Sequence, residues 1–155
     1  MSSKNSSSTA ALMLDLNRVF DKVYAHAAAD ALVEGVDRPP VLTRAQRPLL
    51  RRIALDVSAV VVFRLIPAVT FADNTSDDKV DDFIYLGVVT PVGQTVLRMV
   101  EQIESLIAIG VLRSVWSGTD TPMARKYDVA FNEHIGILRR GIIGIGRPGV
   151  IRPSY

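Results

Sequence analysis

The chain has 155 residues, no cysteine and a formal net charge of +2 at pH 7. Its length fits a single domain, and the absence of cysteine excludes a disulfide scaffold, a zinc–thiolate site and thiol catalysis. The small net charge does not by itself indicate a nucleic-acid partner.

The mean hydropathy of +0.24 is high for a soluble monomer. The longest apolar runs, 57–62 and 106–112, are much shorter than the ~20 residues that a membrane-spanning helix needs, and the N-terminal residues carry no secretory signal. We therefore expect a protein that contacts no membrane and buries part of its apolar surface against partners.

Residues 1–8 are polar and rich in serine, which predicts a flexible N-terminal arm. A first helix is predicted over residues 9–33, capped by Ser8 or Thr9 and ended by Gly35. Its apolar residues recur at spacings of three and four, as an amphipathic helix requires. They are Leu12, Leu16, Val19, Phe20, Val23, Ala27 and Ala28.

A second helix is predicted from Thr43, or from near Arg47 because Pro48 falls in the first turn, to Ile66, since Pro67 cannot continue it. The β-branched run at 57–62 is also typical of a strand. Helical spacing and the length of the segment favour the helix. The spacing is seen at Leu50, Ile53, Val57, Val60, Val61 and Arg64.

Residues 67–89 contain two β-like runs, 68–72 and 83–89, on either side of an acidic loop. They predict either a hairpin or an extended arm, inserted into the helical domain.

Two further helices have similar start signals. One is capped by Thr90 with Pro91 at its first position and ends near Gly110; the other starts at Asp120 or Thr121 with Pro122 and ends at Gly141. Their predicted apolar faces are Val96, Leu97, Val100, Ile103, Leu106 and Ile107, and Met123, Tyr127, Ala130, His134, Ile137 and Leu138.

Residues 142–145 are predicted as a short strand and 147–155 as an extended C-terminal tail. The fold class expected is therefore mainly α: a compact bundle of about four helices with a small β element or extended arm at about 67–89. The helical domain spans 9–146, between the N-terminal arm and the tail.

No pattern in the sequence indicates catalysis, a cofactor or a metal. His26 and His134 lack a second ligand at helical spacing. The acidic loop fails the calcium-loop pattern, because Asp78 and Ile84 replace its glycine and glutamate. The glycines at 144, 146 and 149 match a dinucleotide motif but no helix follows them. We therefore expect no enzyme.

Charged segments are the candidate contact sites. The acidic loop contains Asp73, Asp77, Asp78, Asp81 and Asp82, and the basic tail offers Arg147, Pro148, Val150, Ile151, Arg152 and Tyr155 as partner-binding residues. These segments suit contacts between copies or with separate partners, although both are equally compatible with plain solvation. A basic face of Arg44, Arg47, Arg51 and Arg52 suits phosphate contact, solvated helix ends or interface salt bridges.

Two blocks of the chain resemble a known family. They are AAADALVEGVDRPPVL (27–42) with RPLLRRIALDVSAVVVFRL (47–65), and TPMARKYDVAFNEHIGILRRGIIGI (121–145). They resemble small proteins from the head-gene clusters of Mu-like and other tailed phages, which include head-to-tail connectors. The matching positions are Leu49, Ile53, Ala54, Asp56 and Leu65 in the first helix of the pattern and Tyr127, Asp128, Ala130, Ile135, Leu138 and Gly141 in the second. The arginine that precedes the tyrosine in the family is Lys126 here.

The resemblance implies a structural virion protein that is made in the host cytoplasm and sits in the neck of the virion. Such connector subunits form a homo-oligomeric ring, typically of twelve copies, below the portal protein. The ring extends the DNA channel without sequence-specific contacts and docks the next neck or tail protein. The alternatives are a small helical nucleic-acid-associated regulatory protein that uses the Arg44–Arg52 basic face, and another virion component such as a capsid or tail-completion protein.

Overall fold

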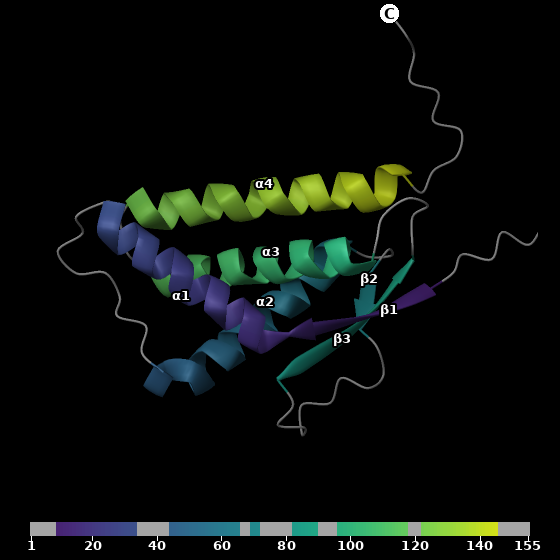
Figure 1. Ribbon diagram of the computed structural model, residues 1–155. Coiled ribbons are helices and arrows are strands. Elements are labelled where there is room, and N and C mark those ends of the chain that lie inside the picture. Colours follow the sequence, from purple (N-terminus) through teal and green to yellow (C-terminus); the bar gives the residue numbers. More distant parts are fainter. Residues whose placement is uncertain are drawn as a thin grey trace, which may run out of the picture.

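The computed structural model describes residues 9–33, 44–65, 69–71, 82–89, 96–117 and 122–145. Within them the fold is mainly α, as predicted, with four α-helices and a small three-stranded sheet. The central helix α3 (Val96–Trp116) packs against α1, α2, α4 and strand β1. Figure 1 shows α4 lying along α3, with α1 running obliquely across α3 and the sheet at one end.

The first helix is shorter than predicted. Residues Thr9–Asp15 form strand β1, and α1 runs over Leu16–Val33. Leu12 and Leu14 are buried while Met13 between them is exposed, which is the alternation of a half-buried strand. Asp15 caps the helix, because its Oδ1 accepts a hydrogen bond from the backbone N–H of Asn17 at 2.9 Å. The predicted start at Thr9 is therefore wrong.

The predicted β element is a hairpin, and it is part of a larger sheet. Strands β2 (Val69–Phe71) and β3 (Phe83–Val89) pair antiparallel, and β1 pairs antiparallel with the other edge of β3. The strand order is β1-β3-β2, with Leu12 opposite Leu86. Strand β3 of the hairpin is thus the central strand of the sheet and also pairs with the N-terminal strand β1.

Helix α2 spans Arg47–Leu65 and follows a short 3-10 turn, Arg44–Gln46. The prediction of a helix that starts near Arg47 is confirmed, and the β-branched run at 57–62 is helical. Val57, Val61 and Val62 face the core. The proposed cap Thr43 and the breaker Pro67 lie outside the described residues.

The predicted glycine stops Gly110 and Gly141 do not end their helices, and the third, Gly35, lies outside the described residues. Gly110 lies inside α3, which continues to Trp116. Gly141 lies inside α4 (Pro122–Ile145), so that 142–145 is helical and the predicted strand there is wrong. A single glycine costs a helix interior only about 1 kcal/mol, which the packing of a long helix outweighs. The caps proposed at Thr90 and at Asp120 or Thr121 lie outside the described residues.

The buried faces of α3 and α4 also differ from the predicted ones. On α4, Phe131 and Ile135 are buried, whereas His134 and Ile137 point to solvent. On α3, Leu97 is exposed and buried positions occur on nearly every side, since other elements surround this helix. The buried side chains of the described residues form one hydrophobic core, and α3 lies at its centre.

Candidate functional site

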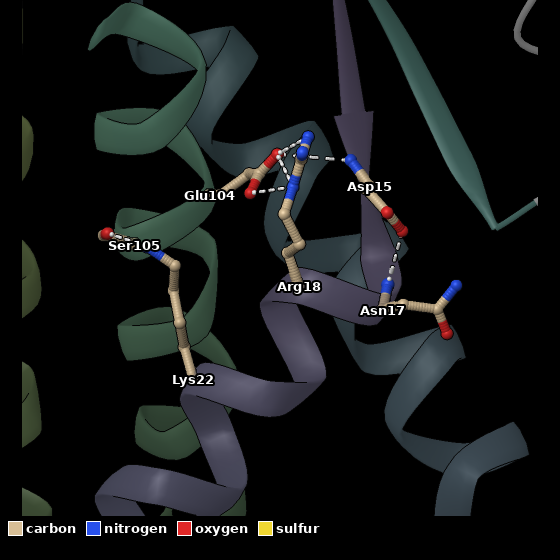
Figure 2. Close-up of polar contacts among 6 residues, drawn as sticks. All are labelled: Asp15, Asn17, Arg18, Lys22, Glu104 and Ser105. Atoms are coloured by element: carbon tan, nitrogen blue, oxygen red, sulfur yellow. Dashed lines mark hydrogen bonds and ion pairs between the residues drawn. The ribbon is translucent and has the colours of Figure 1, made fainter. Parts of the chain in front are cut away.

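An ion pair with a buried carboxylate joins the start of α1 to the middle of α3. Arg18 Nε donates to both carboxylate oxygens of Glu104, at 3.2 and 3.1 Å, and Arg18 Nη2 donates to Oε1 at 2.9 Å. The side chain of Glu104 is only 2% exposed, whereas that of Arg18 is 52% exposed. Figure 2 shows Arg18 reaching from α1 to Glu104 on α3. The carboxylate is therefore buried with its charge balanced by a cation at the surface.

The surrounding polar contacts hold the same corner of the fold. The backbone N–H of Asp15 donates to Glu104 Oε1 at 3.3 Å, and Lys22 Nζ donates to Ser105 Oγ at 2.9 Å, as Figure 2 shows. The hydrogen bond with Glu104 raises the pKa of Arg18 above its ordinary value. The stability linked to a raised basic pKa is present at every pH below the ordinary value, so this pair keeps its cation across the physiological range.

The geometry of this cluster is that of a structural ion pair. Both oxygens of Glu104 already accept charge-assisted hydrogen bonds from Arg18, and Oε1 accepts a third bond from the backbone. Sequence reasoning missed this acid, although a signal was present. Glu104 follows Val100 by four residues and precedes Ile107 by three, so helical spacing places it on the predicted apolar face of α3.

Replacing Arg18 by methionine is expected to lower the Tm by several degrees, because it leaves the buried carboxylate of Glu104 without its cation. The double variant Arg18→Met/Glu104→Leu should recover much of the loss, since two apolar side chains need no partner. Thermal unfolding followed by circular dichroism measures both, with Arg125→Met on the exposed side of α4 as the control. A double variant no more stable than the single one would show that the loss does not come from the unpaired carboxylate of Glu104.

A second buried acid joins the end of α1 to the start of α4. Asp30, which is 8% exposed, accepts a hydrogen bond from the hydroxyl of Tyr127 and pairs with Lys126 Nζ at 2.9 Å. Sequence reasoning had placed Tyr127 on the apolar face of α4, where it is buried, without this partner. The two ion pairs therefore fasten α1 at both of its ends, to α3 and to α4.

The predicted basic face meets one residue of the predicted acidic loop. Arg47 lies 3.0 Å from Asp82 and also donates to Asn17, while Arg51 Nε lies 3.9 Å from Asp82. Arg52 is exposed. Two of the four arginines are thus next to a carboxylate of the same chain. Its negative charge offsets part of the positive potential that these arginines would present to a phosphate.

Most of the other predicted contact residues lie outside the described part of the chain. They are Asp73, Asp77, Asp78 and Asp81 of the acidic loop and Arg147, Pro148, Val150, Ile151, Arg152 and Tyr155 of the tail. Arg44 belongs to the 3-10 turn.

The outer face of α2 exposes large apolar side chains, among them Val60, which was predicted on the apolar face of this helix. Leu49, Val60 and Phe63 are 59%, 46% and 75% exposed. They lie close to one line along the helix, because their separations of eleven and three residues are near whole numbers of helical turns. Arg52 and Asp56 lie between them on the same line and are also exposed. We call this line of five residues the α2 stripe.

Metal-ligand side chains do not gather anywhere among the described residues: no group of three or more histidines, cysteines, aspartates or glutamates could hold an ion. His26 and His134 are both exposed. In the same part of the chain, no helix has the length and apolar character to cross a membrane.

Comparison of the chain with protein-family models, with curated proteins and with solved structures found no match. The described residues form a small helical domain with a three-stranded sheet. Two ion pairs with buried carboxylates fasten it, and the α2 stripe is exposed.

Proposed function

We propose that this chain is a structural virion protein, a head-to-tail connector (adaptor) subunit of a tailed phage, with no catalytic role. Its copies form a ring, of twelve subunits in the family that it resembles, below the portal protein. The ring extends the DNA channel and docks the next neck or tail protein. The protein is made in the host cytoplasm and ends in the neck of the virion.

The observation that carries this proposal is the exposure of large apolar side chains on several elements. Single exposed apolar residues are normal on a protein surface, but those that share one face, as Leu49, Val60 and Phe63 do on α2, suit a subunit that is covered during assembly. The side chains are Met13, Leu32, Leu49, Val60, Phe63, Phe83, Leu97, Val129 and Ile137.

The ion pairs between the helices also support an assembly role. The ion pairs Arg18–Glu104 and Asp30–Lys126 tie α1 to the two helices beside it. A subunit whose helices keep fixed positions presents its outer faces with little cost in conformational entropy on assembly.

The alternative of a nucleic-acid-associated regulatory protein receives less support. Its basic face needs free arginines, and Asp82 lies beside both Arg47 and Arg51. A phosphate binder must lose affinity steeply as salt rises, so a titration of duplex DNA at increasing salt separates this alternative from the connector.

Purified protein mixed with the portal of the same phage should give a ring stacked on the portal in negative-stain images, with a mass that fits a closed ring. The protein alone and an unrelated portal are the controls. A chain that never engages its portal at any tested concentration would overturn the connector proposal. Steeply salt-dependent DNA binding in place of portal binding would favour the regulatory alternative.

A further inference from the structure

The outer face of α2 has a sequence pattern that is symmetric about its buried residue Ala54. Eight exposed positions lie in four pairs at equal distances on either side of it, and they extend the α2 stripe into the preceding turn. The pairs are Ala45 with Phe63, Pro48 with Val60, Leu49 with Ala59, and Arg52 with Asp56. Each apolar pair joins a small or compact side chain with a larger one, and the remaining pair joins opposite charges.

The complementary side chains within these pairs suit an antiparallel contact between two identical helices. In such a contact each residue faces its symmetric counterpart on the other copy. Phe63 would lie over Ala45 of the second copy and Leu49 over Ala59. Large side chains would then fill the spaces above small ones, as helices do when they pack 8–10 Å apart.

The charges in the middle of the stripe point to the same occupant. Arg52 and Asp56 are one turn apart on one face, yet neither takes part in an ion pair within the described part of the chain. An arginine that precedes an aspartate by four residues is in the less favourable order for pairing within a helix. Across a twofold axis, however, each Arg52 meets the Asp56 of the other copy, and the contact forms twice.

We propose that α2 is the interface of a twofold dimer of this chain, with the Arg52–Asp56 pairs at its centre and apolar contacts on both sides. A twofold contact buries the stripe on both copies at once and cannot propagate into a filament. The dimer concerns the free protein and does not rest on the connector proposal, because it needs no portal.

Reversing the charges tests the dimer. The wild-type protein should have twice the 16.9 kDa mass of one chain in light scattering at micromolar concentration. Arg52→Asp and Asp56→Arg should each weaken dimerisation by about tenfold or more, because like charges then face each other twice. The double variant Arg52→Asp/Asp56→Arg should dimerise again, since it restores opposite charges.

Mixing the two single variants gives the sharper result. The Arg52→Asp variant carries two acids on the stripe and the Asp56→Arg variant carries two bases. Like charges therefore repel within a dimer of either variant alone, whereas opposite charges attract in a mixed dimer of the two. Circular dichroism shows that every variant is folded. The controls Glu133→Arg and Arg140→Asp make the same charge changes on the exposed side of α4 and should leave the dimer unchanged.

A wild-type protein that stays monomeric at ~100 µM, well above the micromolar range in which specific dimers form, would overturn the proposal. Folded single variants that fail to form a mixed dimer would overturn it too. Both results leave portal binding unaffected and so stay distinct from a failure of the connector proposal.

Discussion

The variant Phe131→Ala is expected to lower the free energy of unfolding by about 4 kcal/mol. Phe131 is 1% exposed and lies where α4 packs on α3. One face of its ring is covered by the guanidinium of Arg113, 4.9 Å from the ring centre, and that arginine pairs with Asp128 at 2.8 Å. The loss combines an unfilled cavity with a lost cation–π contact.

Urea unfolding measures this loss, provided that the slope of the transition stays the same. Ile137→Ala is the control, because it removes an apolar side chain from the exposed side of the same helix and should change stability by less than about 0.5 kcal/mol. A loss for Phe131→Ala no greater than that for Ile137→Ala would show that α4 does not pack on α3 through this ring.

The second large effect is expected at Gly110, where α3 packs tightly against α2 and α4. A Cβ atom added there would overlap Val57 Cγ1 on α2 and lie 3.0 Å from Phe131 Cε2 on α4. We expect Gly110→Ala to cost about 2 kcal/mol, because overpacking outweighs the roughly 1 kcal/mol that alanine returns to a helix interior.

The same substitution at Gly136 provides the matched control. A Cβ atom at that position of α4 would meet nothing within 4 Å, so Gly136→Ala should stabilise the protein by about 0.5–1 kcal/mol. Adding Val57→Ala to Gly110→Ala should recover part of its loss by making room. Equal effects at the two glycines would mean that α2 and α4 do not approach α3 at Gly110.

The helices could be predicted because apolar residues recur in each of them at spacings of three and four over several turns. Local patterns could not settle where the helices begin and end. Leu12 and Leu16 are four residues apart, which fits a helix, and Leu12, Leu14 and Leu16 also alternate, which fits a strand. Pairing with β3 decides for the strand, and that partner lies far along the chain. Gly110 and Gly141 have the local sequence signature of helix ends. The close packing that accounts for a glycine inside α3, at Gly110, is a tertiary property that local sequence does not reveal.

The candidate site was less predictable than the fold. Glu104 and Asp30 are buried because their partners Arg18, Lys126 and Tyr127 come from other helices, and no local spacing reveals those partners. The contact of Asp82 with Arg47 likewise joins two segments that the sequence analysis treated as separate charged regions. The α2 stripe could have been found from the helical spacing of Leu49, Val60 and Phe63 once the buried side of that helix was known.

The strand order β1-β3-β2 has a consequence for how the chain folds as it leaves the ribosome. Strand β1 is made first, but its only pairing partner among the described strands is β3, whose residues reach Val89. At roughly 5–20 residues per second, β1 waits several seconds for that partner. The hairpin of β2 and β3 closes a much shorter loop and can form as soon as β3 is made. The N-terminal strand is therefore expected to dock last onto the sheet, and the ion pair of Arg18 with Glu104 completes only after α3 has been synthesised.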